Sequence, residues 1–224
     1  MCIRDSTNFL YGQPDGGPTH DAPQNGYLNR SRVSLDYIPR DNNHPYRPAI
    51  IFRMAEAYLS YAEALNESSE RMSHKQEILD NLNKIRHRAG IAEYGTGTDE
   101  NGFTRIKINF SDQKEVRRLI HKERRVEFVG EGVRYHDLRR WKTAHYGIGN
   151  LNEQGENPDW GVNGPDYGMN YYGTEYTDQG DNAFFKRTKY MDRVYPRKFY
   201  WYPIHQSEID KDPTLVQGPF WLGE

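Results

Sequence analysis

The residues most capable of acid–base chemistry lie in the charged segment 121–141. Glu123 and Glu127 stand four residues apart, so on a helix they share one face. That face continues from the apolar Val116 and Ile120, which puts both carboxylates on or beside a buried stripe, where they need partners. Arginines of the same segment suit this role because a guanidinium pairs with a carboxylate at two points. The charged set comprises Glu123, Arg124, Glu127, Glu131, Arg134, Asp137 and Arg140.

Two interpretations of these carboxylates compete. A glycoside hydrolase needs two carboxyl groups about 5–9 Å apart in an open cleft, and one of them must be held protonated by a raised pKa. Neighbouring arginines have the opposite effect, because they lower the pKa of a carboxyl group. We therefore predict an ion-pair network that joins helices, and we predict no catalytic residue.

The sequence motifs of other catalytic and ion-binding sites are incomplete in this chain. His121, His136 and His145 form neither HExxH nor another close metal-ligand spacing. Residues 147–150 lack the GK[ST] ending of a phosphate loop. Residues 178–182 (DQGDN) carry oxygen donors but lack the EF-hand pattern and its terminal Glu, which favours a plain turn over a calcium site. No Ser or Cys stands in a nucleophile elbow, and we predict neither a metal nor a cofactor.

A second group of residues is suited to binding. Sugars present apolar C–H faces and rings of hydroxyl groups, so their sites combine flat aromatic rings with planar hydrogen-bonding side chains. The long segment 145–198 supplies both, and the stretch 25–36 adds more. The predicted ligand-binding residues are Trp160, Tyr167, Tyr171, Tyr172, Asn163, Tyr27 and Asn29.

The competing interpretation is that these rings pack the long segment onto the helices. For any single tyrosine this packing role is favoured, because tyrosine commonly buries its ring and ties down its hydroxyl. For Trp160, which stands in a polar context before Gly161, the two interpretations are balanced. Trp141, Trp201 and Trp221 lie in helix or tail motifs and are predicted to be core residues.

Helical periodicity defines the elements that must position these groups. Apolar spacing predicts helices at about 50–66, 74–89, 112–129 and 133–143. The first has its stripe at Met54, Tyr58, Tyr61, Ala62 and Leu65; the third is capped by Ser111 or Asp112. Short connections pair the helices into hairpins at about 50–90 and 112–144. Residues 145–198 carry almost no periodic signal, and residues 199–224 form a closing tail.

Composition places limits on the molecule as a whole. The 224 residues suffice for one large domain or part of one, and 13% aromatic residues argue against disorder. A net charge of −2 gives no general attraction to nucleic acid. Cys2 is the one cysteine, and no stretch approaches the roughly 18 apolar residues of a membrane span. Residues 1–6 lack the apolar region of a signal peptide, and we expect residues 1–24 to be a truncated or irregular segment.

Three segments together resemble the SusD/RagB family of outer-membrane nutrient-binding lipoproteins from Bacteroidetes. They are FRMAEAYLSYAEALNE followed by LNKIRHRAG, ERRVEFVGEGVRYHDLRRW at 123–141, and FYWYPIHQSEIDKDPTLVQGPFW at 199–221. The tail departs from the family at His205 and Phe220. Residues 25–224 resemble the C-terminal half of such a protein.

The resemblance implies a mainly α fold, with tetratricopeptide-like helical hairpins, long irregular loops and few short strands. It implies a binding protein at the cell surface that hands a glycan or other nutrient to a TonB-dependent, SusC-like outer-membrane transporter. The lipid anchor that would hold it to the membrane is absent from this sequence. Segment 145–198 is expected to face the ligand. A peptide-binding module of the same fold is the alternative, and a glycoside hydrolase is less favoured.

Overall fold

The computed structural model describes residues 8–13, 34, 36, 45–46, 50–147 and 161–222. The chain divides into two compact units. One comprises residues 33–136, and the other comprises residues 1–32 together with 137–224. Among the residues selected from the sequence, Tyr27, Asn29 and Trp160 lie outside the described residues. In the described ranges, no helix is long and apolar enough to cross a membrane.

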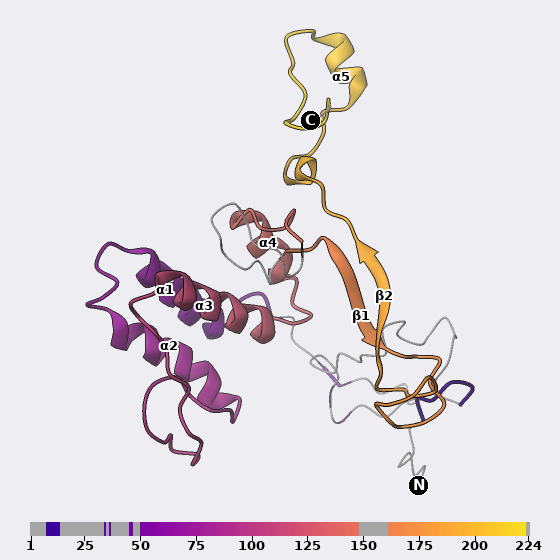
Figure 1. Cartoon of the computed structure of the whole chain (residues 1–224). Coiled ribbons are helices and arrows are strands. Elements are labelled where there is room, and N and C mark those ends of the chain that lie inside the picture. The colour runs from indigo at the N-terminus through magenta and orange to yellow at the C-terminus, as the bar shows by residue number, and fades with distance from the viewer. Residues whose placement is uncertain are drawn as a thin grey trace. The chain divides into compact units, whose positions relative to one another are not determined.

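The 33–136 unit is built from three helices that share one core (Figure 1). They are α1 (Met54–Glu67), α2 (Lys75–Arg88) and α3 (Gln113–Glu127). α1 packs against both α2 and α3, and α2 also contacts α3. The predicted mainly α fold is confirmed. The side chains at the centre of this core are Leu59, Ile78, Leu82, Val116 and Ile120.

Local chemistry fixes two of the helix ends as predicted. The Asp112 carboxylate accepts hydrogen bonds from the backbone N–H groups of Lys114 and Glu115, which would otherwise lack partners at the start of α3. Gly90, just beyond α2, has φ of +66°, a left-handed conformation that glycine adopts at little cost.

The first helix differs from its prediction in both start and face. α1 begins at Met54, and its buried side chains include Ala55, Leu59 and Ala62. Met54 and Tyr61, predicted in the stripe, are 58% and 48% exposed. The small Ala55 and Ala62 let neighbouring helices approach closely, so the buried face is turned about one residue from the expected one. Tyr61 lies at the rim and donates its hydroxyl to Glu77 at 2.7 Å.

The segment that connects α2 to α3 has a defined backbone structure. This connecting segment, residues 91–111, forms isolated bridges between Tyr94 and Ile106 and between Thr98 and Thr104. The Asp99 carboxylate accepts the backbone N–H groups of Glu93, Asn101 and Phe103. Three backbone donors on one carboxylate fix the turn of the segment.

The second unit contains a two-stranded antiparallel sheet, drawn as two arrows in Figure 1. β1 (Gly164–Met169) pairs with β2 (Arg187–Arg193), with an irregularity between Asp166 and Tyr167. Residues 145–198 carry almost no periodic signal, so the expectation of an irregular loop there was wrong for these two strands. The physical reason is that every residue of β2 is exposed, so β2 needs no apolar alternation.

Short helices complete the chain. α4 (Val133–Arg140) ends three residues before its predicted limit, and Lys142 follows with φ of +54°. A 3-10 helix, η1 (Arg197–Tyr200), and α5 (Gln206–Lys211) lie in the tail. A small core around Leu138 and Ala144 holds Val162, Tyr195 and Tyr200.

The tail tryptophans are not the core residues that the sequence predicted. Trp201 is 37% exposed, and Trp141 and Trp221 are half-buried. Cations cover parts of the rings: Arg140 lies 4.8 Å from the Trp141 ring centre, and Lys198 lies 5.1 Å from that of Trp221. These rings therefore pack under charged side chains instead of inside an apolar core.

Candidate functional site

Exposed and half-buried aromatic rings gather beside the β1–β2 sheet in the second unit. β1 supplies one ring, the turn that follows β1 supplies two, the loop before β2 supplies two, and the described residues 8–13 supply one. We call this set the aromatic surface, and it comprises Tyr11, Tyr167, Tyr171, Tyr172, Tyr176 and Phe185.

Two tyrosines of the aromatic surface, Tyr11 and Tyr171, contact the ring of a third, Tyr172. The Tyr171 and Tyr172 ring centres lie 4.4 Å apart, and Tyr11 lies 5.5 Å from Tyr172. Tyr172 is the most open of the three, at 59% exposed. The Tyr171 hydroxyl donates to that of Tyr172 at 3.5 Å, and this hydrogen bond, with burial, raises the pKa of Tyr171.

A close backbone approach holds this tyrosine cluster in place. The Tyr11 N–H donates to the Gly173 carbonyl at 2.9 Å. A Cβ at Gly173 would lie 2.5 Å from Cα of Phe184, so only glycine fits there. The cluster is thus built on tightly packed main chain.

The remaining rings of the aromatic surface are anchored separately. Tyr176 packs edge-on against the buried Phe184 at 5.8 Å, and its hydroxyl accepts the Phe9 N–H at 2.9 Å. The guanidinium of Arg187 lies over the Tyr167 ring, 4.1 Å from its centre. One face of Tyr167 is therefore already occupied by a cation.

Asn163, predicted to bind ligand, is used by the protein itself. Its side-chain N–H groups donate to the carbonyls of His145, at 2.5 Å, and of Tyr195, at 3.3 Å. Its side-chain oxygen accepts the Tyr195 N–H. Both amide hydrogens have backbone acceptors within the protein, so Asn163 fastens the start of β1.

Glu123 of the charged segment lies in the interior of the first unit. It is 6% exposed and accepts hydrogen bonds from Arg86 at 2.5 Å and from the Tyr94 hydroxyl at 2.8 Å. Burial, followed by the charge of Glu123, raises the pKa of Tyr94 well above its ordinary value. This carboxylate takes part in a buried ion pair with Arg86 and does not face an open cleft.

The other carboxylates of the segment also have cationic partners. Glu127 pairs with Arg53 and Arg88, and Arg53 also reaches Glu131 at 2.8 Å. The partners Arg53, Arg86 and Arg88 lie outside segment 121–141, and sequence reasoning missed them because they are remote in sequence.

Two further pairings belong to the predicted network. Asp137 pairs with Arg140 at 2.9 Å, as near neighbours on α4. Arg124 donates to the Ser60 hydroxyl at 3.0 Å and stands over the Phe128 ring. A structural role of the charged segment, as a set of ties between helices, fits this geometry better than an acid–base role.

Tyr11, Tyr176 and Phe185 are the site residues that sequence reasoning did not select. Tyr11 is distant in sequence from the rings it contacts. Tyr176 and Phe185 stand among many aromatics of a segment without periodic signal, so no local pattern distinguishes them.

Comparison with known proteins places the chain among relatives. The sequence model described as the SusD family matches residues 3–221. SusD-like protein P25 of Formosa agariphila is 32% identical over 49% of this chain and 18% of its own length. SusD-like protein P38 of the same organism is 32% identical over 46% of this chain and 19% of its own length.

A solved structure is also similar to this chain. Selenomethionine BT4246 matches with a TM-score of 0.51 and 27% identity, covering 79% of this chain and 25% of that chain. The chain thus spans about a fifth of the two curated relatives, at 18% and 19% of their lengths. With the family match extending over nearly the whole sequence, from residue 3 to residue 221, this chain belongs to the SusD family.

Proposed function

We propose that the aromatic surface binds a glycan or another nutrient at the cell surface, for delivery to a TonB-dependent, SusC-like transporter. Membership of the SusD family supports glycan or nutrient binding at the family level. The observation that carries the assignment to this surface is the contact of Tyr11, Tyr171 and Tyr172, with Tyr172 largely open.

Physical chemistry supports stacking as the mode of binding. A tyrosine ring offers an apolar face for sugar C–H groups and a hydroxyl for hydrogen bonding. The cluster is held by the tight packing of Gly173, so little conformational entropy is lost when ligand binds. Binding without reaction agrees with the family, whose members are generally binding proteins, and with the buried position of Glu123.

An oligosaccharide panel tests the assignment. Tyr172→Ala is expected to weaken glycan binding at least tenfold in isothermal titration calorimetry, because it removes the open ring, whereas Tyr172→Phe keeps the stacking face. Tyr190→Ala, an exposed tyrosine of β2, is the matched control and should bind as the unmodified chain does. Equal glycan affinity of Tyr172→Ala and the unmodified chain would place the site elsewhere. Trp160→Ala belongs in the same series, because the sequence selects that residue.

The rival functions have distinct outcomes in the same series. Saturable peptide binding that is lost in Tyr172→Ala, without any glycan response, would make this surface a peptide-binding site. Release of reducing ends from polysaccharides by the purified chain, abolished by Glu127→Gln, would establish a hydrolase. We expect no such release, because Glu127 is held by Arg53 and Arg88.

The proposed partner and location require the protein in cells. The outer-membrane location, through a lipid anchor on the full-length protein, is part of the proposal. Affinity purification from solubilised membranes should recover a SusC-like barrel together with the tagged protein. Protease added to intact cells should digest it. Recovery of the tagged protein alone, or its protection in intact cells, would argue against transport.

A further inference from the structure

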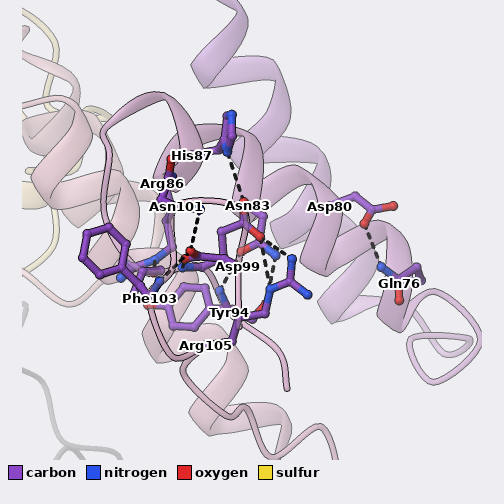
Figure 2. A network of polar contacts seen from close by, with 12 residues as sticks. Gln76, Asp80, Asn83, Arg86, His87, Tyr94, Asp99, Asn101, Phe103 and Arg105 are labelled. Carbon is purple, nitrogen blue, oxygen red and sulfur yellow. Dashed lines mark hydrogen bonds and ion pairs between the residues drawn. The ribbon is translucent and has the colours of Figure 1, made fainter. Parts of the chain in front are cut away.

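A pocket of about 720 Å³ lies in the first unit, between α2 and the connecting segment 91–111. It is separate in residues from the aromatic surface. Figure 2 shows a network of polar contacts that includes several of its lining residues, among them Asn83, Tyr94 and Arg105. This volume falls in the range of binding sites for small and medium ligands.

One wall of the pocket is a second face of α2. Gln76, Asp80, Asn83 and His87 recur at helical spacing along it. The face toward the core carries Ile78, Leu82 and Ile85 instead. From Gln76 to His87 the helix rises about 16 Å, which matches about five residues of an extended chain.

The opposite wall is fastened to α2. The Asn83 side chain donates to the Tyr94 carbonyl at 2.9 Å and accepts the Tyr94 N–H at 2.7 Å. Arg86 of α2 donates to the Ala92 carbonyl at 2.5 Å, and within the connecting segment Arg105 donates to Glu93 at 2.8 Å. With both walls held by hydrogen bonds, the pocket is formed before any ligand arrives, which reduces the entropy lost on binding.

The charges that line the pocket are balanced. Asp80, Glu93 and Glu100 are acidic, and Lys84, Arg105 and Lys107 are basic. Internal contacts engage some of them: Glu93 pairs with Arg105, Asp80 accepts from Gln76, and Lys84 lies over the Tyr58 ring. Within residues 50–147, Glu100 and Lys107 enter none of the ion pairs or hydrogen bonds found. A balanced lining with one uncommitted acid and one uncommitted base suits a ligand of mixed charge better than a polyanion.

Apolar contact is available in the pocket, where the aromatic rings are buried or half-buried. Leu79, Ile108 and Phe110 line the pocket and pack against the helical core. The Tyr94 ring is 3% exposed and lies under Arg86, 4.4 Å from the guanidinium carbon. The pocket therefore offers apolar side-chain contacts, and neither of its aromatic rings, Tyr94 and Phe110, is as open as that of Tyr172.

We propose that this pocket is a second binding site, which takes a short extended peptide carrying an apolar side chain and charges of both signs. Lys107 would meet a carboxylate of the peptide, and Glu100 an ammonium group. The apolar side chain would rest on Leu79, Ile108 and Phe110. The site stands independently of glycan binding at the aromatic surface.

Fluorescence anisotropy with a library of labelled hexapeptides of this composition tests the proposal on the full 224-residue chain. We expect saturable binding that weakens at least tenfold in Lys107→Glu, which reverses an exposed charge. Thr96→Trp, which fills the pocket from an exposed position, should have the same effect. Lys122→Glu on α3 makes the same charge change outside the pocket and should bind peptide normally. Thermal melts establish that each variant is folded.

Capped and free peptides distinguish the two sources of such a ligand. Equal binding of N-acetylated, C-amidated peptides would identify a segment of a larger protein, whereas a requirement for free termini would identify a free peptide. Either result supports a peptide site. Absence of saturable binding, or binding unaffected by both pocket variants, would overturn it. So would oligosaccharide binding lost in Lys107→Glu without any peptide binding. Tyr172→Ala should leave peptide binding unchanged, which separates this test from that of the aromatic surface.

Discussion

Glu123 shows at residue scale why a buried charge can be tolerated. Its carboxylate is 6% exposed, yet it accepts from Arg86 and from the Tyr94 hydroxyl. Burial of two charges costs several kcal/mol, which is offset when both are paired and hydrogen-bonded. The same contacts join three elements: α2, the connecting segment and α3.

Removing this carboxylate should destabilise the protein strongly. Glu123→Ala leaves the Arg86 charge buried without its carboxylate, and we expect a loss of about 3–5 kcal/mol in the free energy of unfolding, measured by urea denaturation. Lys122→Ala, the neighbouring exposed position, should change stability by no more than about 0.5 kcal/mol. A small effect of Glu123→Ala would mean that Arg86 finds other compensation.

Tyr94 should make stability depend on alkaline pH. Burial, and then the Glu123 charge, raise its pKa above the ordinary value of 10.0, so the folded state keeps a proton that the unfolded chain loses. The folded state then binds more protons, and stability falls as pH rises above about 10, by at most about 1.4 kcal/mol per pH unit. Tyr94→Phe should lose stability less steeply there in urea titrations at pH 9–11. Parallel slopes for the two proteins would contradict this account.

At the scale of elements, local sequence fixed the helix ends better than the buried faces. Asp112 and Gly90 mark ends through hydrogen bonds and backbone preferences that involve only near neighbours. The buried face of α1 depends instead on how closely α2 and α3 approach. That is why Tyr61, a plausible stripe residue, lies at the rim.

The cap of α3 gives a test at this scale. Asp112→Ala removes the acceptor of the Lys114 and Glu115 N–H groups, so we expect a loss of about 1 kcal/mol in the free energy of unfolding. Asp112→Asn keeps an acceptor oxygen and should retain most of that stability. Urea denaturation of the three proteins measures the difference. Equal losses in both variants would show that the charge at the helix start matters more than the hydrogen bonds.

For the whole molecule, the two units carry separate candidate sites. The aromatic surface draws its residues from 8–13 and 167–185, and the pocket draws its residues from 76–110. The two sites share no residue and offer different chemistry, open rings in one and balanced charge in the other. We therefore expect them to act independently.

A double variant tests that independence. Tyr172→Ala should weaken glycan binding only, and Lys107→Glu should weaken peptide binding only. The double variant should reproduce each single-variant loss of binding free energy, for glycan and for peptide, within about 0.5 kcal/mol. Calorimetry with each ligand, in the presence and absence of the other, measures the coupling. Coupling of more than about 1 kcal/mol would mean that the two units communicate.

The sequence by itself determined what depends on neighbours along the chain: the four main helices, the capped start of α3, the glycine after α2, the mainly α class and the family. Tertiary structure decided the partners of those elements. Glu123 pairs with Arg86 across 37 residues, and Tyr11 meets Tyr172 from the far end of the chain. Helical periodicity and caps are read within a few residues, whereas pairing across helices and the shape of a pocket depend on how remote segments pack. For the same reason the hydrogen bonds of Asn163 to the backbone of His145 and Tyr195 are visible only in the fold.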